Sequence, residues 1–99
     1  MRYQLKVSAT AYQETGDAYE YYEEQSPGLG ERFLKSLEDS YLKLSQTPQY
    51  YSYIRNDKNI RDIKIKTFPF VIIFQIMKNT VFVLRVLNTN RNHESLKNL

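Results

Sequence analysis

The residues with the clearest chemical potential are cations gathered in the second half of the chain. Of the 99 residues, 14 are Lys or Arg and 11 are Asp or Glu, for a formal net charge of +3. Residues 8–30 hold five acids and no Lys or Arg, whereas residues 51–99 are rich in both cations. Such a surface favours an acidic partner, either nucleic acid or an acidic protein segment. Lysines on strand faces and turns can equally serve only to keep sheet edges soluble.

Clustered Lys, Arg, His, Tyr or Glu side chains can stabilise a developing negative charge and transfer protons. The cluster available here is thin, and its members are Arg61, Lys64, Lys66, Arg85, Arg91 and His93. The chain has one histidine, and it falls in a polar segment where a surface role is the more frequent one.

Arg61 is the most informative of these candidates. It shares the strand phase of Ile63 and Ile65, yet a guanidinium cannot be left buried without a partner. One interpretation places it at a strand end, with its stem packed and its head in water or paired with an acid of the first helix. The other interpretation makes it an anion contact on an open face of the sheet.

Three strands in residues 60–88 must position these cations. Residues 60–66 alternate apolar and polar side chains, which predicts a half-buried strand. Residues 70–76 and 81–87 are almost continuously apolar, β-branched and aromatic, as is typical of strands that are central in a sheet or covered on both faces. The links between them are too short for helical crossovers, so we expect antiparallel hairpins.

The first half of the chain predicts one strand and two helices. Residues 3–8 alternate like a half-exposed strand, and residues 9–25 carry one apolar stripe at helical period. Residues 26–30 break this helix and begin a second one, which extends to about residue 45 before Pro48. Residues 49–59 show no clear period and are expected to form a loop, and residues 89–95 to form a polar, irregular tail.

The expected fold is therefore a single α+β domain over residues 1–99. An N-terminal strand and a two-helix antiparallel hairpin would combine with the three later strands, so that both helices pack on one face of a mainly antiparallel four-stranded sheet. The other face would stay open, edged by basic residues and the polar tail, and would be the place to look for a binding site.

Several classes of protein are excluded by composition. The chain has no cysteine, so neither a disulfide nor a thiolate metal site can form, and we expect no metal. No apolar run approaches the roughly 18 residues that a membrane span needs, and the N-terminus lacks a signal-peptide core. We therefore expect a soluble, cytoplasmic protein without a membrane partner.

The element order and several local strings together resemble the RelE/ParE family of bacterial toxins, the toxic halves of type II toxin-antitoxin pairs. No single string is specific, but their joint order and spacing are, and they cover nearly the whole chain: residues 18–24, 28–34, 44, 48, 60–65, 68–70 and 81–92. The resemblance implies growth inhibition, a role in plasmid stabilisation, no cofactor, and a cognate antitoxin. In such pairs a partly disordered antitoxin segment usually wraps the toxin.

The family contains two activities, and two positions distinguish them. RelE-like members cut mRNA in the ribosome, whereas ParE-like members act on DNA gyrase. The arginine that RelE-like nucleases carry early in the strand after the turn falls at Val71, and the histidine of many relatives falls at Asn88, which cannot exchange a proton near neutral pH. The resemblance therefore implies a ParE-like toxin acting on gyrase. It makes Asn88 and the six cations candidates for contacts with the target or the antitoxin, Arg91 among them because the family keeps an arginine in its tail.

Two alternatives stay open. Arg61, Lys64, Lys66 and Arg91 could suffice for a weak ribosome-dependent endonuclease through phosphate-charge stabilisation, and the catalytic candidates would then be Arg61, Lys64 and Arg91. The chain could also be a decayed toxin that survives as an interaction module and is harmless without a partner.

Overall fold

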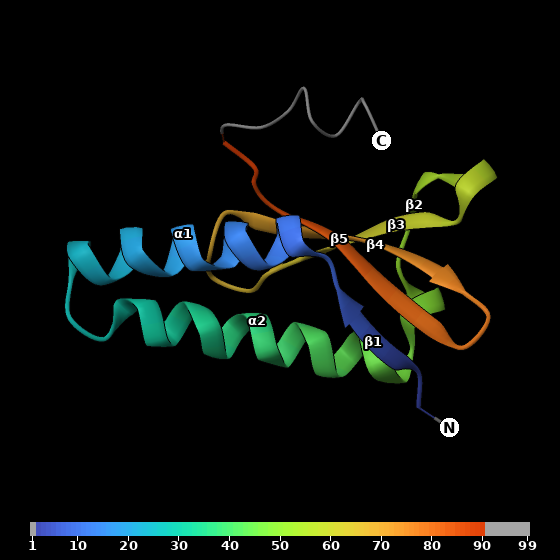
Figure 1. The fold of residues 1–99 in the computed structure, drawn as a ribbon, viewed down its shortest axis with the longest axis horizontal. Helices are drawn as coiled ribbons and strands as arrows, with labels where there is room; N and C mark the ends of the chain where they lie inside the picture. Colours follow the sequence, from blue (N-terminus) through green and yellow to red (C-terminus); the bar gives the residue numbers. More distant parts are fainter. Residues whose placement is uncertain (1, 91–99) are drawn as a thin grey trace.

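The fold is that of a computed structural model, which describes residues 2–90. Figure 1 shows a helical hairpin lying across one face of a twisted sheet. In chain order the elements are β1 (Gln4–Val7), α1 (Ala9–Gln25), α2 (Leu29–Gln46), the short 3-10 helix η1 (Pro48–Tyr50), β2 (Tyr53–Arg55), the 3-10 helix η2 (Asn56–Lys58), β3 (Ile60–Lys64), β4 (Phe70–Met77) and β5 (Thr80–Asn88).

Side-chain hydrogen bonds to backbone N–H groups fix two places in the helical hairpin. One is the start of α1, and the other is the turn between α1 and α2. The Ser8 side chain accepts a hydrogen bond from the Ala11 N–H at 3.0 Å, which satisfies one of the free donors of the first turn. At the other end of α1, the Glu23 carboxylate accepts from the N–H groups of Gly28 and Gly30 at 2.9 and 3.0 Å. Gly28 has a φ of 88°, a left-handed conformation that favours glycine. These contacts reverse the chain tightly enough for the two helices to lie antiparallel.

The two helices are in close contact at Gly30. A Cβ atom built there would lie 2.8 Å from the ring of Tyr19 and 2.8 Å from its backbone oxygen. We expect Gly30→Ala to lower the free energy of unfolding by about 1–3 kcal/mol, because the backbone oxygen cannot swing away as a side chain can. Gly16→Ala is the matched control. It has open space around it, lies within α1, and should instead stabilise the protein by up to about 1 kcal/mol. Urea unfolding of both variants measures the difference, and equal effects at the two sites would contradict the steric argument.

The sheet has five strands in the order β1-β5-β4-β3-β2. The four later strands are antiparallel neighbours, as expected for hairpins, but β1 pairs parallel with β5, with Gln4 opposite Thr80. The prediction of four strands was therefore one strand short, because residues 53–55 form β2 rather than a loop. This strand has three residues and an irregular register against β3, so it leaves too little alternation to be recognised in the sequence.

Both helices pack on one face of the sheet, as predicted. Phe33, Leu37 and Leu44 of α2 are at most 3% exposed and form a core with apolar side chains of β3, β4 and β5. An aromatic group closes one end of this core, with the rings of Tyr22 and Phe33 centred 5.0 and 5.4 Å from that of Phe68. This core joins the helical hairpin to the sheet.

The opposite face of the sheet differs from the expected open surface. A second apolar cluster lies there, formed by Ile60, Val71, Ile73 and Leu87, none more than 4% exposed. Ile54 and Leu84 pack against it. β4 and β5 are nearly continuously apolar, so they present apolar side chains to both faces of the sheet. The centre of this face is therefore not available as a bare binding surface.

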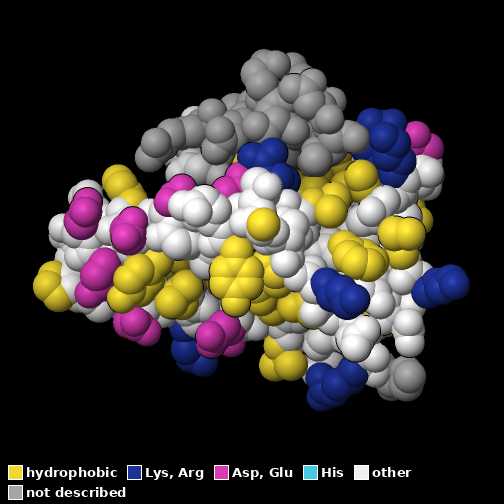
Figure 2. Space-filling model, viewed as in Figure 1, with side chains coloured by type: hydrophobic (Ala, Val, Ile, Leu, Met, Phe, Trp, Pro, Cys, Tyr) yellow, Lys and Arg dark blue, Asp and Glu magenta, His cyan; other side chains and the backbone are white. Residues whose placement is uncertain are grey.

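Surface charge is divided between the two halves of the molecule. In the view of Figure 2, acidic side chains gather over the part of the helical hairpin near its turn, and most of the Lys and Arg side chains lie over the other half. The candidate site must therefore be sought where the cations gather.

Within residues 2–90, no helix combines the length and the apolar character that crossing a membrane requires.

Candidate functional site: a basic groove between α2 and β3

The structure separates the predicted site residues instead of joining them in one cluster. Lys64 and Lys66 are exposed beside α2. Arg61 and Arg85 are engaged in internal contacts, and Asn88 lies at another edge of the sheet. The remaining two candidates, Arg91 and His93, lie outside the described residues.

Arg61 is a buried residue near the start of β3, and its head is paired within the chain rather than lying in water or contacting an acid of α1. It is 8% exposed and lies opposite Phe74, which places it on the helix-covered face. Its Nη1 donates to the carbonyl oxygens of Gln49 and Tyr51, both at 2.8 Å, and its Nη2 donates to the Tyr53 hydroxyl at 2.8 Å. The guanidinium carbon also lies 4.0 Å from the centre of the Tyr53 ring. Arg61 therefore fastens η1 and β2 to the sheet and is not free to hold a ligand.

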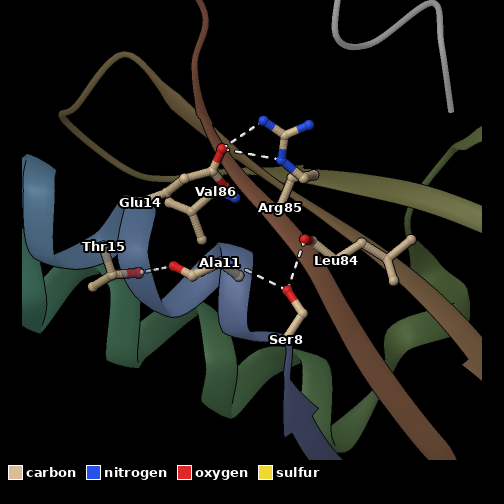
Figure 3. A network of polar contacts seen from close by, with 7 residues as sticks. All are labelled: Ser8, Ala11, Glu14, Thr15, Leu84, Arg85 and Val86. Carbon is tan, nitrogen blue, oxygen red and sulfur yellow. Dashed lines mark hydrogen bonds and ion pairs between the residues drawn. The ribbon is translucent and has the colours of Figure 1, made fainter.

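Arg85 is likewise held by the protein itself. Figure 3 shows its guanidinium against the carboxylate of Glu14, which projects from α1. The Nε and Nη2 atoms of Arg85 lie 3.0 and 2.6 Å from Oε2 of Glu14, and Oε1 accepts from the Val86 N–H at 2.8 Å. The Glu14 carboxylate thus pairs with a cation. It also accepts a hydrogen bond from a backbone N–H of β5, beyond the point where β1 ends.

The two positions that distinguish the family branches have no ionisable side chain to offer. Val71 is 3% exposed within the second apolar cluster. The Asn88 side chain accepts a hydrogen bond from the Asn90 N–H at 2.8 Å and lies beside Glu14 and Asp17 in a hollow between α1 and β5. The surroundings of Asn88 are therefore acidic on the described side, which suits a cationic contact better than a phosphate.

A basic groove runs between the C-terminal half of α2 and the outer edge of β3. It consists of two adjoining hollows of about 510 and 340 Å³ that share Lys43 and Lys64. Tyr50 and Tyr51 line the first hollow and Lys66 lines the second. Lys43 and the tyrosines were not among the predicted site residues. The position of Lys43 in the last turn of α2 was visible in the sequence, but its approach to β3 depends on how the two elements pack.

Lysines outnumber acids in this groove, with Lys43, Lys64 and Lys66 against Asp39 and Asp62. Two acids line it, and one of them, Asp39, is 3.8 Å from Lys35. The other is Asp62, where partial burial raises the pKa of the carboxyl while nearby Lys64 opposes that rise. In the part of the chain that the structure describes, Lys43, Lys64 and Lys66 have no ion-pair partner. The groove is therefore suited to binding an anion.

The chemistry available in the groove is that of lysine ammonium groups, phenols and one carboxylate. Burial, followed by the neighbouring Tyr50, raises the pKa of Tyr51, so its hydroxyl stays protonated at neutral pH. Among residues 2–90, no three His, Cys, Asp or Glu side chains are grouped so that they could hold a metal ion. What the groove offers directly is charge and aromatic surface.

Comparison with known proteins first defines the class of fold. A solved structure described as the chromosomal ParDE TA system from P. aeruginosa matches this chain with a TM-score of 0.76 at 16% sequence identity. The match covers 87% of this chain and 95% of that one. Two helices on a mixed sheet are thus the fold of a protein in a toxin-antitoxin system. No curated protein sequence gives a significant match.

The family follows from the sequence itself. The family model described as the ParE toxin of type II toxin-antitoxin system, parDE, matches residues 5–93. The chain therefore belongs to the ParE toxin family. The resemblance drawn from the element order and local strings is confirmed, including its preference for the ParE-like branch.

Proposed function

We propose that this protein is a cytoplasmic toxin that inhibits DNA gyrase by binding to it and that a cognate antitoxin neutralises it. The observation that carries the proposal is the environment of Val71 at the position where an RNA-cleaving relative would need an arginine. This side chain is buried in an apolar cluster, so a cation could not occupy its place without a large desolvation cost. Family membership supports the toxin role, and the buried valine supports a mechanism without RNA cleavage.

The antitoxin is proposed to lie across an apolar hollow of about 230 Å³ between α1 and α2. Tyr12 and Tyr41 line it together with Leu34, Leu37 and Val7 of the adjacent strand. Tyr12 is 72% exposed although it is aromatic, and burial raises the pKa of Tyr41 to about 12, so the Tyr41 hydroxyl stays protonated in the cell. An apolar hollow with aromatic walls suits the apolar face of a partner segment.

Inducing the chain alone in bacterial cells tests the proposed function. We expect growth to stop, plasmid supercoiling to change and break-induced DNA repair to begin, because a gyrase inhibitor acts on DNA topology. Co-expression of the small protein encoded beside this chain should restore growth, and the two should purify together.

The same experiment separates the alternatives. Unchanged DNA together with ribosome-positioned cuts in mRNA would show the endonuclease alternative instead, in which exposed Lys64 and Lys66 stabilise the phosphate charge. Normal growth at a confirmed level of folded protein would show an interaction module that has lost its toxicity.

A further inference from the structure

We propose that the groove between α2 and β3 binds a single strand of nucleic acid, with lysines on its phosphates and the Tyr50 ring against a base. The proposal concerns the isolated protein and goes beyond gyrase inhibition. It is tested with purified protein and the proposed function with cells, so either proposal can fail while the other stands.

The lysines supply the electrostatic part of this site. Lys43 comes from the last turn of α2, Lys64 from the end of β3, and Lys66 from the turn that follows. All three are exposed and none is ion-paired to a described residue. Thr67, next to Lys66, has a φ of 70°, which is unusual for a β-branched residue and fixes the direction of this turn. Three unpaired cations along one groove match a ligand with one negative charge per nucleotide.

Tyr50 supplies the aromatic part. Its side chain is 82% exposed, the most exposed of the large apolar residues in the described chain. The ring meets that of Tyr51 at 5.2 Å and an interplanar angle of 86°, so the contact is edge to face. Tyr51 in turn contacts buried Phe74 at 6.3 Å. The inner ring thus anchors the outer ring, which remains available to stack on an unpaired base.

An acidic peptide is the other ligand that a basic groove could take, and the edge of β3 argues against it. The Ile65 N–H donates to the Phe70 carbonyl, so in this antiparallel pair Lys64 turns its backbone groups outward. On one side of it the Asp62 N–H donates to the Ser52 carbonyl at 3.4 Å, and on the other the Lys66 carbonyl accepts from the Thr67 hydroxyl. The free edge is therefore about one residue long, too short to pair with an added strand.

A duplex is also a poor match because its bases face each other. The faces of paired bases are stacked within the helix, whereas a single strand presents them to aromatic side chains. The exposed ring beside the lysines therefore favours an unpaired strand. Whether that strand is DNA or RNA depends on the sugar, and the experiment below separates the two.

The test measures the fluorescence anisotropy of labelled oligo-dT and oligo-U of equal length on titration with the purified protein. The variant Lys43→Gln/Lys64→Gln is expected to bind about tenfold or more weakly at moderate salt and to reduce the slope of log K against log salt by about 1.4. The matched control is Lys6→Gln/Lys58→Gln, which removes the same charge from exposed positions outside the groove and should leave affinity nearly unchanged. Circular dichroism confirms that each variant is folded.

A second pair of variants tests stacking. Tyr50→Ala is expected to weaken binding at least about fivefold without changing the salt slope, whereas Tyr12→Ala, which removes a similarly exposed ring from α1, should not. The inference is overturned if neither oligonucleotide binds, or if the two lysine pairs have equal effects. It is also overturned if a poly-glutamate peptide competes as well as the oligonucleotide, or if duplex DNA binds as tightly and Tyr50→Ala has no effect.

Discussion

Replacing Arg61 with Ala is expected to lower the free energy of unfolding by about 3 kcal/mol or more. The substitution leaves the carbonyl groups of Gln49 and Tyr51 and the hydroxyl of Tyr53 without their donor in part-buried contacts, and each group that water cannot then reach costs about 1–3 kcal/mol. It also removes a cation from the face of the Tyr53 ring. Because a domain of this size is typically stable by only about 5–15 kcal/mol, such a loss is a large share of the total.

Urea unfolding of three variants checks this expectation. Arg61→Lys should recover part of the loss, because a lysine keeps the charge but cannot reproduce the fork of donors. Arg55→Ala removes an exposed arginine that pairs with Asp57 at 3.0 Å and should leave stability essentially unchanged. A stable, folded Arg61→Ala protein would refute the structural role. If the expectation holds, loss of toxicity in this variant reports on folding and carries no information about catalysis.

Replacing Glu14 with Ala is expected to lower the free energy of unfolding by about 2–4 kcal/mol. The Glu14 carboxylate holds Arg85 through two donors and also accepts the Val86 N–H, so its removal leaves a part-buried guanidinium and a strand-edge donor without partners. The side chains are 20% and 28% exposed, so water recovers some of the cost and the estimate lies below that for a fully buried pair.

A double-mutant cycle separates these two contributions. If the ion pair dominates, Arg85→Ala in the Glu14→Ala background should cost little more, because Arg85 has already lost its carboxylate partner. Glu20→Ala on the exposed side of the same helix is the control and should have little effect. Additive effects of Glu14→Ala and Arg85→Ala would show that the pair contributes little and that the Val86 contact carries the stabilisation.

Much of the fold could be predicted from local pattern. Strict alternation identified the strand at residue 60, the helical stripe identified α1, and Pro48 marked the end of α2, because each signal depends on neighbours close in sequence. The three-residue strand β2 could not be recognised in this way. β2 is defined by its pairing with β3, and its three residues are too few to show a period in the sequence.

The candidate site could be predicted only in part. Lys64 and Lys66 were visible as outward residues of an alternating segment, and they do line the groove. Lys43 joins them from a helix that is distant in sequence, which no local pattern can indicate. The contacts of Arg61 depend on the carbonyl groups of Gln49 and Tyr51 and on the Tyr53 hydroxyl, and those of Arg85 depend on a carboxylate in α1. A cation's charge is evident in a sequence, but its partners are not.

The parallel pairing of β1 with β5 also governs how this molecule comes into being. Ser8, at the end of β1, donates through its side chain to the carbonyl of Leu84, which lies 76 positions later in the chain. During synthesis β1 therefore has no strand to pair with until β5 has been made, and such distant pairings form slowly. A nascent chain can build its helical hairpin early, but its sheet stays open beside β1 until β5 has left the ribosome.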